Sequence, residues 1–160
     1  MENLIALGAE VGAQLKARGE TVAVAESSTG GLVCAALLSV PGASVYFQGG
    51  GVVYTQASRE GLMRIAKGEM EGIRSSSEPY ALLLARTARE RMGATWGVGE
   101  TGAAGPTGNR YGDAPGHTCI AVVGPQEKVI TLETGRDDRE ENMWVFTRAV
   151  IDLFAECLKS

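Results

Sequence analysis

The chain has 160 residues, of which 44% are hydrophobic and 21% charged, and its formal net charge is −4. This length predicts a single domain over residues 1–160, because a chain of this size buries about 68 to 70% of its unfolded surface without disulfides or metals. The acidic balance and the lack of a Lys/Arg cluster argue against an electrostatic nucleic-acid surface.

Cysteine, histidine and hydropathy patterns narrow the class of protein further. Cys34, Cys119 and Cys157 lie in separate apolar runs, so we expect buried thiols in a reducing compartment. A single histidine, His117, and the lack of a CxxC motif argue against a metal site, and the histidine alone would have to serve any Ser-His-Asp triad. No apolar run reaches the roughly 18 residues of a membrane span, and we expect a cytoplasmic protein without membrane contact.

The first quarter of the chain alternates helical and strand patterns. Apolar residues at helical spacing predict a helix over Glu2 to Arg18, and Gly19 is suited to end it. The β-branched run at 21–25 predicts a strand, and the apolar stretch at 29–40 predicts a helix. "PGAS" at 41–44 then predicts a turn.

The middle of the chain continues the alternation. "GGGVVYT" at 49–55 predicts a second, buried strand, and residues 56–67 form an amphipathic helical pattern. A helix is predicted over 75–92, with Pro79 in its first turn, where a missing NH costs little. "ATWGVGET" at 94–101 predicts the third strand.

The last third predicts a hairpin followed by a helix. The strands at 116–124 and 128–135 are separated by a short turn, so they should pair antiparallel. Asp138 and Glu141 have the spacing of an N-cap pair that opens the final helix. The whole order predicts an α/β fold, a three-layer α/β/α sandwich with a mixed, mostly parallel sheet of about five strands, one of them antiparallel.

Two of the predicted strand ends carry candidate functional residues. At the first, "ESSTGG" runs from Glu26 to Gly31 at a strand-to-helix junction, where unpaired helix-start NH groups can hold an oxyanion or a phosphate. A serine there would have an oxyanion site beside it. The plainer interpretation is that Ser28 or Thr29 only caps the helix.

The second strand end is the long loop over 99–116, which is rich in glycine and proline. Gly97, Gly99 and Gly102 fit GxGxxG, but they fall inside a strand and no helix follows, so this is not a dinucleotide fingerprint. Loops longer than about 12 residues are usually functional or disordered. We therefore interpret this loop as a second candidate wall of a site.

Four motifs, in the same order along the chain, resemble the CinA C-terminal domain family. "AESSTGGLVCAALLSVPGASVYFQGGGVVYT" at 25–55 is similar to the family's opening, and "TGAAGPTG" at 101–108 to its T/S-G-I-A-G-P-x-G loop. "PGHTCIAV" at 115–122 and "GRDDREE" at 135–141 are similar to a later strand and to the start of the last helix. The resemblance covers nearly the whole chain, which makes it more specific than any single motif.

The resemblance implies an activity and a set of site residues. Family members are similar to nicotinamide-nucleotide amidohydrolases, which convert nicotinamide mononucleotide to nicotinate mononucleotide and ammonia with a serine nucleophile and without metal or cofactor. The nucleophile position falls on Ser27, and the strand-end tyrosine on Tyr54. The family's glutamate, threonine and glycine pair fall on Glu26, Thr29, Gly30 and Gly31, and we expect the NH groups of Thr29 to Gly31 to hold the oxyanion.

The remaining substrate contacts are expected from the two later motifs. The loop that contains Thr101, Gly102 and Gly105 would approach the ribose phosphate, and Arg110 or Arg139 would hold the phosphate. The expected partner is a small-molecule nucleotide, and we expect a homo-oligomer.

One departure from the family leaves two functions open. "YTQASR" places Arg59 where the family has a lysine thought to assist the serine, and a guanidinium stays protonated and cannot act as a general base. Glu100 stands where the family has an apolar or small residue, and "GIRSSSE" is altered as well. The chain is therefore either an amidohydrolase that uses Ser27, Tyr54 and Arg59, or a nucleotide-binding or oligomeric module that has lost the chemistry.

Overall fold

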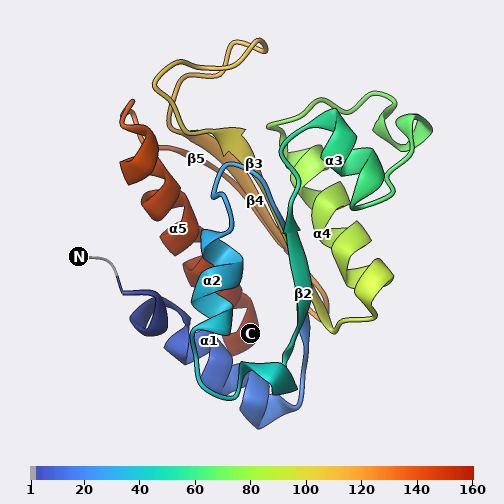
Figure 1. Ribbon diagram of the computed structural model, residues 1–160, viewed down its shortest axis with the longest axis vertical. Coiled ribbons are helices and arrows are strands. Elements are labelled where there is room, and N and C mark those ends of the chain that lie inside the picture. Colours follow the sequence, from blue (N-terminus) through green and yellow to red (C-terminus); the bar gives the residue numbers. More distant parts are fainter. Residues whose placement is uncertain (1–2) are drawn as a thin grey trace.

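A five-stranded sheet in the order β2-β1-β3-β4-β5 forms the centre of the computed structural model, which describes residues 3–160 (Figure 1). β1 pairs in parallel with β2 and β3, whereas β4 is antiparallel to both β3 and β5. Only β4 runs against the others, which confirms the predicted mixed sheet. The strands are β1 (Val22–Glu26), β2 (Phe47–Val52), β3 (Trp96–Ala103), β4 (His117–Val123) and β5 (Lys128–Glu133).

Helices cover both faces of the sheet, so the three-layer prediction is confirmed (Figure 1). One face carries α1 (Leu4–Arg18), α2 (Leu32–Leu38) and α5 (Arg139–Lys159). The other carries α3 (Gln56–Gly61) and α4 (Glu78–Met92). Short 3-10 turns lie at Ala43–Val45 and Lys67–Met70, and the predicted start of the first helix at Glu2 lies outside the described residues.

The two faces of the sheet bury side chains of different size. Facing α1, α2 and α5, the sheet presents Val22, Val24, Val98 and the largest buried side chain, Trp96. The Trp96 ring meets Phe154 of α5 edge-on, with the ring centroids 5.6 Å apart. Aromatic burial of this kind makes this face the larger part of the core.

The face toward α4 is built from small residues instead. A Cβ added at Gly97 would lie 2.0 Å from the carbonyl oxygen of Ala85, and one at Gly99 would lie 2.3 Å from that of Ala81. α4 therefore packs directly on the backbone of β3. This contact explains two of the three glycines that imitate a dinucleotide motif, and at the third, Gly102, a Cβ would lie 2.3 Å from the His117 carbonyl oxygen of β4.

Several predicted boundaries differ from the structure. The second helix begins at Leu32 rather than at residue 29, because Gly30 (φ +65°) and Gly31 (φ +100°) are in the left-handed region and hold residues 27–31 in a turn. β2 begins earlier than predicted and ends at Val52, so Tyr54 lies beyond the strand.

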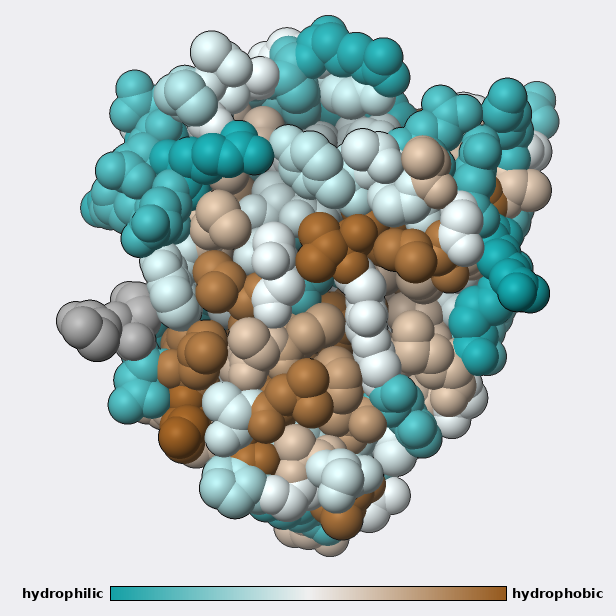
Figure 2. Space-filling view, viewed as in Figure 1, coloured by the Kyte–Doolittle hydropathy of each residue, from teal (hydrophilic) through white to brown (hydrophobic). Residues whose placement is uncertain are grey.

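The surface is polar at one end and apolar on one face. Figure 2 shows hydrophilic residues at the end where the loop after β3 projects, whereas apolar residues gather over α2 and β2. Exposed apolar side chains on or beside those two elements include Leu38, Val45 and Val52. Within residues 3–160, no helix is long and apolar enough to cross a bilayer.

All three cysteines are free thiols. Cys119 and Cys157 are buried, as expected, and Cys34 is half-buried. Burial, and then the charge of the neighbouring Glu26, raise the pKa of the Cys34 thiol far above its ordinary value. These cysteines are therefore poor nucleophiles.

Candidate functional site

Glu26, the last residue of β1, closes the start of α2 from inside the protein. Its side chain is fully buried, and its Oε1 accepts a hydrogen bond from the Thr29 hydroxyl at 2.6 Å. Three backbone NH groups also donate to its carboxylate: those of Gly31 at 2.8 Å, Val33 at 3.2 Å and Cys34 at 2.9 Å. The helix start is thus occupied by a carboxylate of the same chain.

A second buried glutamate, Glu100 of β3, holds the turn that precedes the helix. Its Oε1 accepts from the NH groups of Ser27 and Thr29, both at 3.0 Å. Its Oε2 accepts from the Ser28 hydroxyl and, at 2.7 Å, from the Thr118 hydroxyl of β4. Glu100 is fully buried, so these bonds form away from water.

These contacts overturn one expectation about the oxyanion. The NH groups of Thr29 and Gly31 donate to Glu100 and Glu26, and that of Gly30 donates to the Ser27 carbonyl at 3.0 Å. They are not free to bind a ligand, because the two carboxylates already fill the positive end of the helix. The capping interpretation also needs correction, since Glu26 rather than Ser28 or Thr29 closes the helix start.

A cavity of about 320 Å³ opens at the carboxyl ends of β1 and β3. This is the position where open α/β sheets bind ligands. Segments after β2, before α4 and after β3 complete the wall. It is lined by Ser27, Val53, Tyr54, Thr55, Gln56, Arg59, Ser75, Ser76, Tyr80, Thr101, Gly102 and Arg110.

The cavity unites some of the sequence-predicted residues and leaves others outside. Ser27, Tyr54, Arg59, Thr101, Gly102 and Arg110 belong to its wall. Glu26, Thr29, Gly30, Gly31, Gly105 and Arg139 do not.

Ser27 is the candidate nucleophile, and its hydroxyl is free to meet a ligand. The residue is 8% exposed and lines the cavity, and its Oγ makes no hydrogen bond within residues 3–160. Among the described residues no fully buried polar side-chain atom lacks a partner, so solvent reaches this hydroxyl. Its NH is held by Glu100, which fixes the backbone while leaving the side chain accessible.

Two arginines of the wall carry charge that no carboxylate neutralises among the described residues. Arg59 donates to the Ser75 hydroxyl at 3.5 Å and lies over the Tyr80 ring, 5.5 Å from its centroid. Arg110 donates to the Tyr111 hydroxyl at 2.9 Å. An anionic ligand would meet two guanidinium groups in this cavity.

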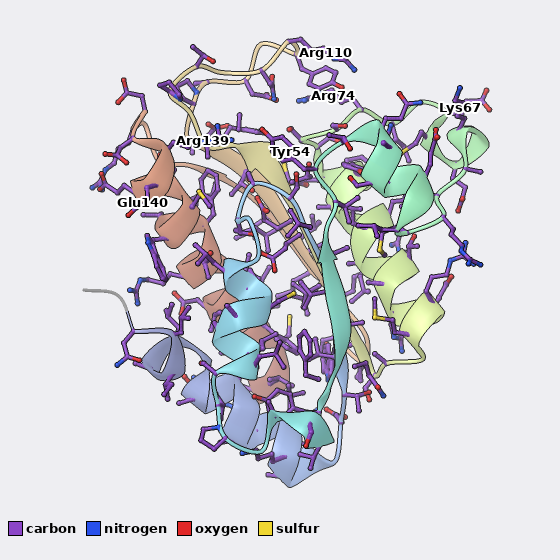
Figure 3. All side chains as sticks on the ribbon, in the orientation of Figure 1. Tyr54, Lys67, Arg74, Arg110, Arg139 and Glu140 are labelled. Atoms are coloured by element: carbon purple, nitrogen blue, oxygen red, sulfur yellow. The ribbon has the colours of Figure 1, made fainter. Side chains whose placement is uncertain are left out.

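The expected phosphate ligand Arg139 lies at the rim instead. Its guanidinium donates to the Gly105 carbonyl at 2.5 Å and to the Tyr54 hydroxyl at 3.2 Å. Figure 3 shows Arg139 and Tyr54 facing each other from α5 and the segment after β2. At Gly105 (φ +121°) a Cβ would lie 2.6 Å from the Asp137 carbonyl oxygen, so this glycine is needed for chain packing rather than for ligand approach.

Ser76 forms a strained part of the wall and is held by its neighbours. Its φ of +57° is costly for a residue with a side chain. Its NH donates to the Thr101 hydroxyl at 3.1 Å, and its carbonyl accepts from His117 Nε2 at 2.8 Å. His117 does not line the cavity, so no Ser-His pair forms with Ser27.

His117 is engaged on both ring nitrogens. Besides the Ser76 contact, its Nδ1 lies 2.5 Å from a Glu133 carboxylate oxygen. Burial lowers the pKa of His117, but the hydrogen bonds to Glu133 and Ser76 and the charge of Asp113 outweigh burial, so the pKa is raised. The His117 ring therefore joins β4 to β5 and to the cavity wall.

A cluster that sequence reasoning missed holds the loop after β3. Arg74 donates to both carboxylate oxygens of Asp113, at 2.8 and 3.3 Å, and lies 5.1 Å from the Tyr111 ring centroid. The Arg110 guanidinium lies 5.0 Å from the same ring (Figure 3). The hydrogen bond from Arg110 lowers the pKa of Tyr111 against the opposing effect of burial. The altered "GIRSSSE" segment was the one available signal.

Metal ligands do not gather anywhere in the described part of the chain. Within residues 3–160, no group of three or more His, Cys, Asp or Glu side chains could hold a metal ion.

Comparison with known proteins supplies the family. The family model of the CinA C-terminal domain matches residues 5–158. A CinA-like protein of Anaeromyxobacter sp. strain K is 42% identical over 128 residues, which cover 80% of this chain and 31% of the relative. A CinA-like protein of Prochlorococcus marinus strain MIT 9313 is 43% identical over 111 residues, or 69% of this chain and 26% of the relative. The chain thus spans about a third or less of these curated relatives.

Solved structures share the fold. A competence-damaged protein (CinA) superfamily member from Klebsiella pneumoniae 700603 superposes with a TM-score of 0.90 at 23% identity, over 99% of both chains. The competence/damage inducible protein CihA from Agrobacterium tumefaciens gives 0.87 at 25% identity, over 100% of this chain and 98% of the other.

Proposed function

The chain belongs to the CinA C-terminal domain family, and we propose that it is a nicotinamide-nucleotide amidohydrolase-type protein that binds nicotinamide mononucleotide in the Ser27 cavity. The substrate follows from the family resemblance of the sequence motifs. The geometry supports the proposal through the free Ser27 hydroxyl and the two unneutralised arginines of the same wall. The observation that carries the proposal is the free hydroxyl of Ser27 on a cavity of ligand size.

The proposed reaction proceeds through an acyl-enzyme. Ser27 Oγ attacks the carboxamide carbon, the C–N bond breaks, and the amide nitrogen leaves as ammonia after it gains a proton. Water then attacks the ester, which releases nicotinate mononucleotide and returns the proton to Ser27. The sum is nicotinamide mononucleotide plus water giving nicotinate mononucleotide plus ammonia.

The arginines are assigned to the phosphate in this proposal. Arg59 and Arg110 line the cavity without a carboxylate partner among the described residues, and arginine pairs well with phosphate oxygens. Arg139 acts on Tyr54 at the rim, through the 3.2 Å hydrogen bond to its hydroxyl. A net charge of −4 provides no general attraction for anions, so these local groups must provide it.

A second candidate is a nucleotide-binding module without amidase activity. It is favoured by the composition of the cavity wall, which contains no carboxylate, imidazole or amine among residues 3–160. Arg59 cannot accept the serine proton. The remaining candidate bases are the two tyrosines of the wall, but the Tyr54 hydroxyl already accepts from Arg139, and burial raises the pKa of Tyr80.

Ammonia release from nicotinamide mononucleotide by the purified protein separates the two candidates, with Ser27→Ala as the control. We expect slow release by the wild type and none by the variant, with calorimetric binding of the nucleotide kept in both. Binding without release would establish the module. Neither binding nor release would reject both candidates.

Cellular location and assembly belong to the same proposal. We propose a cytoplasmic homo-oligomer, supported by three free thiols and by the exposed Leu38, Val45 and Val52. Light scattering of the purified chain tests the assembly, and a monomeric mass would contradict it.

A further inference from the structure

Glu100 stands where the resemblance to the family implies an apolar or small residue, and its carboxylate accepts five hydrogen bonds at and beside the Ser27 turn. Its two carboxylate oxygens accept the NH groups of Ser27 and Thr29 and the hydroxyls of Ser28, Thr29 and Thr118. It is fully buried and does not line the cavity. It therefore cannot act on a ligand except through the residues that it holds.

Glu26 provides the natural comparison, because it is equally buried and belongs to the same turn. Its carboxylate accepts from the Thr29 hydroxyl and from the NH groups of Gly31, Val33 and Cys34, and it makes no hydrogen bond to Ser27. The two carboxylates therefore accept different backbone NH groups. Glu26 accepts those at the start of α2, and Glu100 accepts those of Ser27 and Thr29.

One backbone NH group of the turn has no acceptor among the described residues. The Ser28 NH makes no hydrogen bond within residues 3–160, whereas those of Ser27, Thr29, Gly30 and Gly31 are all engaged. It directly follows the candidate nucleophile in the chain. Ser28 does not line the cavity, so the fixed part of the turn that matters for a ligand is Ser27 itself.

We propose that Glu100 is the positioning residue of Ser27: it accepts the NH groups of Ser27 and Thr29 and so holds the turn in the shape in which Ser27 lines the cavity. The proposal rests on the amidohydrolase function. Positioning of this kind affects the transition state more than it affects substrate binding, since Glu100 touches no part of the cavity.

The experiment compares Glu100→Ala, Glu100→Gln and Thr118→Val, with Glu26→Gln as the matched control. A glutamine at residue 100 keeps an oxygen for the NH groups of Ser27 and Thr29, and its amide can donate to Thr118, whose hydroxyl can turn to the Thr101 carbonyl at 3.2 Å. Thr118→Val removes one donor to Oε2 and keeps the side-chain shape.

For nicotinamide mononucleotide deamidation, Glu100→Ala should lower kcat at least about tenfold while KM stays within about threefold. Glu100→Gln and Glu26→Gln should keep kcat within about threefold, and Thr118→Val should fall between. An equal loss in Glu100→Gln and Glu100→Ala, a rise in KM that accounts for the whole loss, or full activity of Glu100→Ala would each overturn the proposal.

Hydrogen–deuterium exchange of residues 26–34 provides a readout that needs no activity. The amides of residues 27 and 29 should exchange about tenfold faster in Glu100→Ala and stay protected in Glu100→Gln. If the wild type releases no ammonia, the amidohydrolase function fails while this measurement still decides whether Glu100 holds the turn. Unchanged exchange in Glu100→Ala refutes the positioning role. If Glu100→Ala does not fold, faster exchange at residues 27 and 29 in Thr118→Val supports it and unchanged exchange refutes it.

Discussion

The two strand ends that form the cavity are held in opposite ways. At the end of β1, the turn of residues 27–31 is fixed by two fully buried carboxylates, Glu26 and Glu100. At the end of β3, the loop of residues 104–116 is held by the Arg74–Asp113 pair, whose arginine is about two-fifths exposed. The first side of the site is thus held from the protein interior. On the second side, buried Asn142 holds the base of the loop through the Ala104 carbonyl at 2.7 Å, whereas the outer part around Asp113 is held at the surface.

This difference predicts that the two strand ends affect different properties, the shape of the Ser27 turn at one end and the affinity for a ligand at the other. Buried hydrogen bonds to charged groups are strong and little screened, so the Ser27 turn should keep its shape in any salt. Exposed ion pairs contribute little and weaken with salt. We therefore expect variants at the β1 end to change stability and chemistry, and variants at the β3 end to change ligand affinity.

The largest effect on stability should come from Glu26→Ala, which removes one of the two buried carboxylates at the end of β1. It leaves the NH groups of Gly31, Val33 and Cys34 without their acceptor, and each unsatisfied buried group costs about 1–3 kcal/mol. We expect a loss of at least about 3 kcal/mol in the free energy of unfolding, measured with urea. Glu26→Gln is the control and should lose less than half as much. A loss under about 1 kcal/mol would show that water replaces the carboxylate.

Arg59→Lys tests whether the missing general base limits the rate of deamidation. General-base assistance typically contributes 10²–10⁴-fold, and a lysine can supply it where a guanidinium cannot, because burial can lower its pKa. We expect nicotinamide mononucleotide deamidation to rise at least about tenfold, while the affinity for the nucleotide falls by up to about tenfold, because a lysine that acts as a base is neutral and pairs less well with the phosphate than Arg59. Arg91→Lys, on the exposed side of α4, is the control. A rapid wild type that Arg59→Lys does not improve would assign the base to another residue, with Tyr54 first.

Arg74→Ala tests the surface-held end. Loss of the Asp113 pair and of the Tyr111 contact frees the loop that carries Arg110, so the affinity for nicotinamide mononucleotide should fall about three- to tenfold by calorimetry. Stability should change by less than about 1 kcal/mol. Arg86→Ala breaks an exposed pair with Glu127 outside the cavity and serves as the control. Equal affinities in the two variants would remove the loop from the binding site.

The smallest effect should be a pH dependence from His117, whose Nε2 donates to the Ser76 carbonyl of the cavity wall. Its pKa in the folded protein lies above its ordinary value of 6.5, so the protonated form stabilises the fold at low pH and this contribution is lost as pH rises through the folded-state pKa. The free energy of unfolding should decline as pH rises above about 6.5 and through the raised folded-state pKa, and His117→Gln should flatten that decline. An unchanged slope in the variant would assign the pH dependence elsewhere.

Local sequence patterns were sufficient for the fold. The apolar stripe of the last helix, the glycine that ends α1 and the short turn between β4 and β5 all predicted elements that the structure contains. These signals act within a few residues of the elements that they specify, so they survive without knowledge of the tertiary structure. The boundary of α2 was wrong because it depends on acceptors supplied from outside the helix.

The site was only partly predictable from the sequence, because some of its contacts join residues that are far apart in the chain. Ser27, Arg59 and Arg110 were identified by motif and by position at strand ends, and the cavity includes them. The partner of the Ser27 NH lies 73 residues away in the chain, and no periodicity relates the two. Glu100 looked from sequence like a change in pocket charge, and only the register of β1 beside β3 turns it into a buried acceptor.

The backbone contact between β3 and α4 has a consequence for how this chain can vary. At Gly97 and Gly99 the added Cβ would collide with main-chain carbonyls of α4, which no rotamer change can relieve, so even alanine should be selected against there. The opposite face, with Trp96 against Phe154, can exchange volume between neighbouring side chains. Sequence drift and core redesign therefore have room on one side of this sheet and almost none on the other.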